Sequence, residues 1–241
     1  FAGDLLHNPK SITNGLLDKL LESLTHNNIY AISGNHDQAG RNTIEKPASS
    51  YITSLAKKGL LTSMDFNHVE FPEFHLYGVP YLHRNAGFEK YVRAMRPQSP
   101  SILMIHTDLP GAQDTTGYEI DEHDLKSLKM FKRFDLVLCG HIHKSQRLFW
   151  NVQMLGATMQ QRRSDTDYHM GYWEIYSDLS MKFRKLTAPK YYYIKEGEEL
   201  PDTYNIYLPI LDASNNDSNE YSFHPSSNKN KLAIMYCREK G

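Results

Sequence analysis

The stretch DLVLCGHIHKS, residues 135–145, places an apolar run directly before a glycine and two histidines. A short apolar run of this kind predicts a buried strand. His141 and His143 stand two residues apart, so in an extended chain their side chains would point the same way. Gly140 permits a sharp turn or a close approach to a bound group. Open α/β sheets bind ligands at the C-terminal ends of their strands, so this pair indicates a metal site.

Three other apolar runs also end in residues that can bind a metal. Asp4 follows the opening run, GNHD (residues 34–37) follows IYAIS, and His106 ends SILMIH. Each of these residues alone is typical of a turn. Because all four groups follow predicted strands, we expect one crevice at the C-terminal ends of those strands to bring them together. Carboxylate, amide and imidazole ligands together favour manganese, iron or zinc over calcium or magnesium. Asp4 is the natural bridge between two ions, which such sites hold roughly 3.5–4 Å apart.

The order of predicted elements defines the fold class. Leucines at helical spacing predict a helix over residues 14–25, and further helices are expected at 49–58, 87–96 and 122–131. Strands expected at 61–66 and 74–79 alternate with them, which predicts an α/β fold with a largely parallel sheet. Short runs from 145 to 187 predict an antiparallel meander. We expect one domain over residues 1–189 and the start of a capping region or linker over 190–241.

Composition excludes several classes of protein. The 241 residues contain 27 Lys and Arg against 28 Asp and Glu, so the chain as a whole lacks the excess positive charge typical of nucleic-acid-binding proteins. A local cluster of basic residues could still bind nucleic acid, because binding depends on where the charge lies. The two cysteines, Cys139 and Cys237, argue for a reducing compartment. No apolar run reaches a membrane span of roughly 20 residues. These features predict a soluble cytoplasmic protein without a membrane segment.

The ends of the chain lead to a further expectation. The sequence opens on FAGDLL, which resembles the tail of a strand already under way, and it closes within the apolar run LAIMYC. We therefore expect a fragment of a longer protein, cut at both ends.

Together, the Gly-Asp pair, GNHD, the histidine of SILMIH and GHIH resemble the signature of calcineurin-like metallophosphoesterases. The resemblance implies a four-layer αββα sandwich with a dinuclear metal centre. The family's opening Asp-x-His motif is absent from this sequence and is expected upstream of Phe1. The fold is accordingly expected to lack its first strand, to carry a partial C-terminal appendage, and to lack half of the ligands of one ion.

The resemblance also implies a role for each residue. Asp4 would bridge both ions, with His143 on the first ion and Asn35, His106 and His141 on the second. His36 would stabilise the transition state or protonate the leaving oxygen, oriented by Asp37, while a water activated by the two metals attacks. The implied cofactors are two divalent ions, with Mn²⁺ first and Fe²⁺ or Zn²⁺ as alternatives.

Residues 1–187 resemble more closely the SbcD-type nuclease subunits of double-strand-break repair, including phage relatives. The segments that carry this likeness are GDLLHNPKSITNGLLDKLLESL and IDEHDLKSLKMFKRFDLVLCGHIHK, together with MLGATMQQRRSDTDYHMGYWEI. The likeness implies a DNA exonuclease or endonuclease that works with an SbcC-like coiled-coil ATPase subunit and can form a homodimer. It would act in the cytoplasm, or in the host cytoplasm if the protein is phage-encoded.

Substrate recognition leaves alternatives open. Arg162 and Arg163, in QQRRSD, can hold a DNA backbone phosphate or be two solvated loop residues. Tyr81 and its neighbours in YGVPYLHR can contact nucleotide or pack the domain. A rival function is hydrolysis of a small-molecule or phosphoprotein ester. A metal-binding scaffold without chemistry is disfavoured, because His36 and the downstream ligands persist together.

Overall fold

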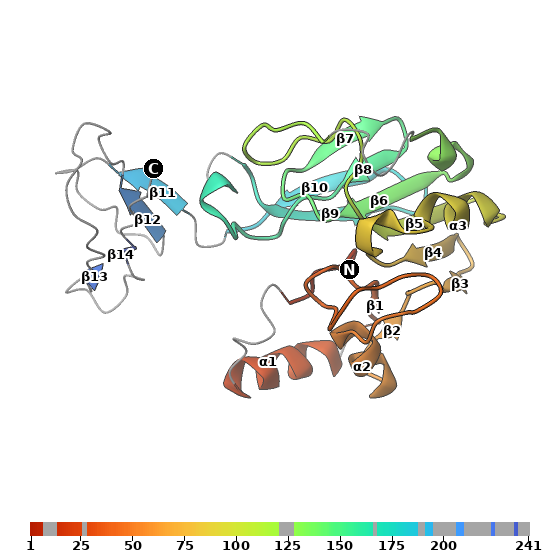
Figure 1. The fold of residues 1–241 in the computed structure, drawn as a ribbon, viewed down its shortest axis with the longest axis horizontal. Coiled ribbons are helices and arrows are strands. Elements are labelled where there is room, and N and C mark those ends of the chain that lie inside the picture. The colour runs from red at the N-terminus through yellow and green to blue at the C-terminus, as the bar shows by residue number, and fades with distance from the viewer. Residues whose placement is uncertain are drawn as a thin grey trace. The chain divides into compact units, whose positions relative to one another are not determined.

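The computed structural model describes residues 1–6, 14–25, 28–120, 128–165, 168–187, 191–194, 206–209, 223–224 and 234–235 (Figure 1). The chain divides into two compact units. Unit 1 comprises Phe1–Gly156 and Trp173–Lys182, and unit 2 comprises Ala157–Tyr172 and Phe183–Gly241. The expected domain boundary at residue 189 stays a prediction.

A six-stranded sheet forms the centre of unit 1. Its order is β3 (His68–Glu70), β4 (His75–Val79), β5 (Ser101–His106), β6 (Leu136–Gly140), β8 (Val152–Met154) and β7 (Gln146–Phe149). Strands β4, β5, β6 and β8 run parallel, and only β3 and β7 pair antiparallel at the edges. The largely parallel sheet is thus confirmed. The predicted antiparallel pairing is confirmed for β7 and β8, but β8 also pairs with β6 and so extends the parallel sheet, which the prediction did not include.

A second, smaller sheet lies beside the first residues of the chain. Strands β1 (Tyr30–Ala31) and β2 (Thr62–Ser63) are parallel. Ala2 forms a parallel bridge with Ile32, and the Ile32 N–H donates to the Phe1 carbonyl at 3.1 Å. The prediction that these opening residues pair like a strand is confirmed. Asp4 therefore follows a strand-like segment.

Three buried clusters separate four layers of secondary structure. Helices α1 (Asn14–Thr25) and α2 (Tyr51–Lys57) cover the small sheet (Figure 1), and α3 (Phe88–Ala94) and η3 (Leu128–Arg133) cover the outer face of the large one. Side chains alternate along β5, so that Ile102 and Met104 face the small sheet whereas Leu103 and Ile105 face α3 and η3. The four-layer αββα arrangement is therefore confirmed.

The helix boundaries follow local sequence signals. Ser50 caps α2: its Oγ accepts from the Thr53 N–H, and the Thr53 hydroxyl accepts from the Ser50 N–H. The predicted helices at 49–58 and 87–96 correspond to α2 and α3. Of the helix predicted at 122–131, residues 122–127 lie outside the described residues, and η3 is a 3₁₀ helix. No helix in the described part of the chain is long and apolar enough to cross a membrane.

The remaining elements are short. They are η2 (His83–Asn85), η4 (Arg163–Asp165), β9 (Gly171–Ile175), β10 (Met181–Lys185), β11 (Tyr191–Ile194), β12 (Ile206–Pro209), β13 (Phe223–His224) and β14 (Ile234–Met235). Strand β9 pairs with β10, β11 runs parallel to β12, and β13 runs antiparallel to β14.

Asp135 joins the N-terminal ends of β5 and β6, and it predicts a pH dependence of stability. Its Oδ2 accepts from Ser99 Oγ, Ser101 N and Ser101 Oγ at 2.8–2.9 Å. Burial alone would raise the pKa of Asp135, but these hydrogen bonds outweigh it and lower the pKa. A lowered folded-state pKa means that the stabilisation is present above about pH 4 and is lost as the pH falls through the folded pKa.

Asp135→Asn is expected to lower the free energy of unfolding at pH 7 by ~1–2 kcal/mol. The variant should also lose less stability than the wild type on acidification below about pH 4. Urea unfolding at several pH values measures both effects. Asp18→Asn, at an exposed position of α1, is the control. Parallel pH profiles for Asp135→Asn and the wild type would contradict the prediction.

Candidate metal centre

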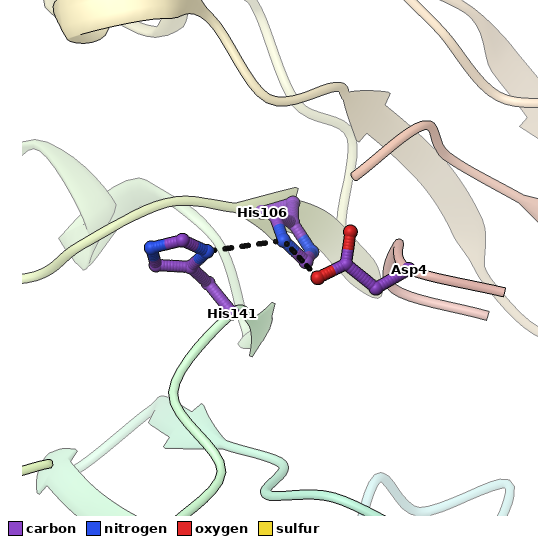
Figure 2. A group of neighbouring side chains, drawn as sticks. All are labelled: Asp4, His106 and His141. Atoms are coloured by element: carbon purple, nitrogen blue, oxygen red, sulfur yellow. Dashed lines mark hydrogen bonds and ion pairs between the residues drawn. The ribbon is translucent and has the colours of Figure 1, made fainter. Parts of the chain in front are cut away.

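Three side chains from separate parts of unit 1 meet at the C-terminal ends of the strands (Figure 2). One ligand atom each of Asp4, His106 and His141 lies within 4.8 Å of the other two. His106 is the last residue of β5 and pairs with Gly140, the last residue of β6. His141 follows directly. The parallel register therefore brings both histidines to the same edge of the sheet.

Asn35 completes this group from the loop after β1. Its Oδ1 lies 3.0 Å from His106 Nε2 and 3.0 Å from His141 Nδ1. Asp4 Oδ2 lies 3.3 Å from His106 Nε2, and the two histidine nitrogens are 3.2 Å apart. The structure thus brings together all four residues predicted for the second ion. Their identity as metal ligands stays a prediction.

The surroundings of the two histidines determine which nitrogens face inward as acceptors. His106 Nδ1 lies 2.7 Å from the Ala2 carbonyl oxygen, which can only accept, so in the neutral ring Nδ1 carries the proton. His141 Nε2 lies 3.2 Å from Asp108 Oδ1 and is protonated for the same reason. The lone pairs of His106 Nε2 and His141 Nδ1 therefore point into the cluster.

Four acceptor atoms consequently converge without a donor of their own. They are Asp4 Oδ2, Asn35 Oδ1, His106 Nε2 and His141 Nδ1. A cation satisfies such a group, and this donor set suits a borderline divalent ion. The residues present therefore fit a metal ion.

The electrostatics of Asp4 favour its charged form. Burial alone would raise the pKa of Asp4, but the hydrogen bond and charge that His106 supplies when its ring is protonated lower it, as do the His36 N–H and charge. The net effect lowers the pKa of Asp4 to about 2. A deprotonated carboxylate is the form that binds a cation.

The backbone is strained at two residues of the cluster. Asp4 has φ 51° and His141 has φ 89°, both in the left-handed region that residues with a Cβ rarely adopt. Such conformations cost roughly 1–3 kcal/mol each and gather at functional sites. The strain at His141 also corrects one prediction. His141 and His143 do not follow strand alternation, because β6 ends at Gly140 and His141 is not extended.

Two glycines preceding candidate ligands are required by close packing. A Cβ at Gly34 would lie 2.1 Å from Asp4 Oδ1 and 2.3 Å from the Asp4 backbone nitrogen. A Cβ at Gly140 would lie 2.0 Å from the Ala2 carbonyl oxygen. The loops that carry the ligands therefore touch at their backbones.

Gly34→Ala is accordingly expected to weaken Mn²⁺ binding at least about tenfold, because displacing a group that holds a ligand typically has effects of this size. Isothermal titration calorimetry measures the affinity. Gly40→Ala is the matched control, because nothing lies within 4 Å of a Cβ at Gly40. Equal affinities in the two variants would show that the close approach at Gly34 has no role in metal binding.

The loop at residues 34–37 is tied to the cluster by backbone groups. The His36 N–H donates to Asp4 Oδ1 at 2.9 Å. Asp37 is fully buried; its Oδ2 accepts from the Gly34 N–H at 2.9 Å and its Oδ1 from the Leu6 N–H at 3.3 Å. Burial raises the pKa of Asp37, and the charge of Asp4 adds to the effect. The hydrogen bond predicted between Asp37 and His36 stays a prediction.

Sequence reasoning missed a polar network behind this loop. Ser33 donates to Asp65 through its N–H at 2.7 Å and its hydroxyl at 2.5 Å, and the hydroxyls of Ser33 and Ser50 share a 2.6 Å hydrogen bond. Burial raises the pKa of Asp65 in spite of the hydrogen bonds from Ser33. Asp65 and Ser33 lie 32 positions apart in the chain, so no local pattern indicates the pair.

Asp108 and Tyr81 were also not assigned to the metal cluster from the sequence. Asp108 contacts His141, and that hydrogen bond lowers the pKa of Asp108. The Tyr81 ring stacks on the His141 ring at a centroid distance of 5.8 Å. The sequence signal that could have indicated Asp108 is its position two residues after the predicted ligand His106.

The other predicted site residues stay predictions. His143 is partly buried in the loop after β6 and is outside the three-residue cluster. Arg162 is exposed and Arg163 begins η4, both in unit 2. The Arg162 N–H donates to Asp165 Oδ2 at 3.0 Å, which shapes the local turn.

Comparison with known proteins agrees with the geometry of the cluster. The model of the calcineurin-like phosphoesterase family matches residues 1–145, which include every residue of the cluster. A search of curated proteins found no match. Because the family model covers more than half of the chain, the protein belongs to the calcineurin-like phosphoesterase family.

Proposed function

We propose that this protein is a metal-dependent DNA nuclease that hydrolyses phosphodiester bonds. Family membership supports a metal-dependent phosphoester hydrolase. The observation that carries the proposal is the convergence of four acceptor atoms from Asp4, Asn35, His106 and His141. Two divalent ions are proposed, with His143 as a ligand of the first and Mn²⁺ as the preferred metal.

The chemistry divides between the ions and the protein. Bound divalent ions would supply positive charge for a phosphoryl oxygen and lower the pKa of water. Asp4, whose lowered pKa keeps it ionised at neutral pH, would help to hold the ions and would neutralise part of their charge. His106 and His141 would hold their acceptor nitrogens in place through the Ala2 carbonyl and Asp108.

His36 is the proposed catalytic residue. Its N–H is bonded to Asp4, which places the residue beside the cluster while leaving metal ligation to other side chains. In this position an imidazole can donate a proton to the leaving oxygen or stabilise charge on the phosphoryl group. Asp37 holds the loop that carries His36 through the backbone N–H groups of Gly34 and Leu6.

DNA is proposed as the substrate because the sequence resembles the SbcD-type nuclease subunits over residues 1–187. Arg162 and Arg163 are proposed to contact backbone phosphates. An SbcC-like coiled-coil ATPase, a homodimer and a cytoplasmic location are proposed on the same resemblance. Size-exclusion chromatography with light scattering tests the dimer, which the proposal expects at micromolar concentration.

A nuclease assay tests the substrate class. With Mn²⁺, the protein is expected to release nucleotides from linear DNA and to lose that activity in EDTA. The His141→Ala variant is the control for contaminating nucleases. Hydrolysis of p-nitrophenyl phosphate or a cyclic nucleotide, with DNA left intact, would contradict the nuclease proposal and support the small-molecule alternative.

A further inference from the structure

Asp108 lies on the side of the His141 ring that faces away from the cluster. His141 Nε2 is 3.2 Å from Asp108 Oδ1, whereas Nδ1, across the ring, faces Asn35 Oδ1. Asp108 comes from the loop after β5 and His141 from the loop after β6, so this contact joins two neighbouring ligand loops. The Asp108 side chain is 43% exposed.

A neutral histidine can offer its Nδ1 lone pair only if the proton is on Nε2. A carboxylate beside Nε2 favours that tautomer, orients the ring and makes the ligating nitrogen more basic. Tyr81 restrains the plane of the same ring, because the two rings stack at an interplanar angle of 29°. The backbone of His141 is already fixed in an unusual conformation with φ 89°.

We propose that Asp108 is a positioning residue that holds His141 in the tautomer and orientation required to bind the cation. The proposal rests on the metal site of the proposed function and is independent of the phosphoester hydrolysed. Asp108 is not a ligand of the same ion, because its contact is with the nitrogen on the far side of the ring. It acts through His141.

The simpler alternative is an exposed ion pair, which would have little effect on any property of the protein. The two interpretations differ in the expected effect on metal affinity. A partner that orients a metal-binding histidine typically changes affinity by about 10–100-fold. A surface ion pair would leave it unchanged.

Calorimetric titration with Mn²⁺ tests the proposal in the full chain. Asp108→Ala is expected to weaken binding about 10–100-fold, whereas Asp108→Asn, which keeps an oxygen that can accept from Nε2–H, should stay within about threefold of the wild type. Asp114→Ala is the matched control, because Asp114 lies in the same loop and its Oδ1 accepts from Thr116 and Tyr118 in a local turn. Wild-type affinity in Asp108→Ala would overturn the proposal. Equal losses in Asp108→Ala and Asp114→Ala would also overturn it, because they would reflect a disturbed loop.

A second measurement needs no metal. Long-range ¹H–¹⁵N spectra of the metal-free protein report which His141 nitrogen carries the proton, with the signal assigned by its loss in His141→Gln. The Nε2–H form is expected in the wild type, and a mixture of tautomers in Asp108→Ala. The same tautomer in both proteins would overturn the proposal. If the wild type bound no Mn²⁺, the metal site would fail, but this spectrum would still test the Asp108–His141 pair.

Discussion

Asp4→Asn is expected to weaken Mn²⁺ binding by at least about 100-fold and to abolish metal-dependent hydrolysis at micromolar metal. Asp4 supplies the single carboxylate among the four converging acceptors, and an amide in its place carries no charge to attract a cation. Removing a residue that only hydrogen-bonds to a metal ligand typically weakens metal affinity by roughly 10–100-fold. The loss expected for Asp4→Asn is larger, because Asp4 would bind the metal directly. Calorimetry and hydrolysis of DNA measure the two effects.

The fold should survive this substitution. In the Asp4→Asn variant the amide oxygen can still accept from the His36 N–H, so the contact that holds the loop is retained. Because the pKa of Asp4 is lowered to about 2, this carboxylate is ionised at the neutral pH of the titration. Circular dichroism serves as the control for folding. A folded Asp4→Asn variant with wild-type Mn²⁺ affinity would contradict the assignment of Asp4 as a ligand.

His36→Gln is expected to lower kcat by about 10²–10⁴-fold while Mn²⁺ affinity stays within about threefold of the wild type. The reason is the proposed position of His36, which is attached to Asp4 through its backbone but does not belong to the converging acceptors. The substitution leaves the backbone N–H in place. Steady-state kinetics at saturating Mn²⁺ measures the effect.

The choice of substrate separates the two roles proposed for His36. If His36 protonates the leaving oxygen, the loss should be large for DNA, whose leaving group is a poor one, and small for bis(p-nitrophenyl) phosphate. If His36 stabilises charge on the phosphoryl group, both substrates should lose activity equally. Unchanged kcat for both would remove His36 from the mechanism.

The strand ends that carry the cluster were predictable because one signal recurs in the sequence. The apolar runs that form β5 and β6 each end on a candidate ligand, and parallel pairing places such ends together. Asn35 followed from the GNHD motif and its resemblance to the family. The geometry at His141 was not predictable, because its φ of 89° occurs beside a tertiary contact, the close approach of Gly140 to Ala2, that leaves no local signal in the sequence.

The supporting residues were harder to predict because their contacts are tertiary. Asp65 bonds to Ser33 and Asp108 to His141 across long sequence separations, and neither pair produces a helical or strand periodicity. The position of β8 illustrates the same limit for the fold. Its run predicted a strand correctly, but its pairing with β6 depends on packing in the central sheet.

Anomalous diffraction from crystals loaded with Mn²⁺ tests the central claim most directly. We expect a manganese peak coordinated by Asp4 Oδ2, Asn35 Oδ1, His106 Nε2 and His141 Nδ1. A second histidine pair provides an internal comparison: His68 Nε2 and His75 Nδ1 lie 3.2 Å apart on the β3–β4 edge, and among the described residues no carboxylate converges with them. Manganese bound only at His68 and His75, or no peak among the four acceptors at saturating metal, would contradict the assignment of this cluster as the metal centre.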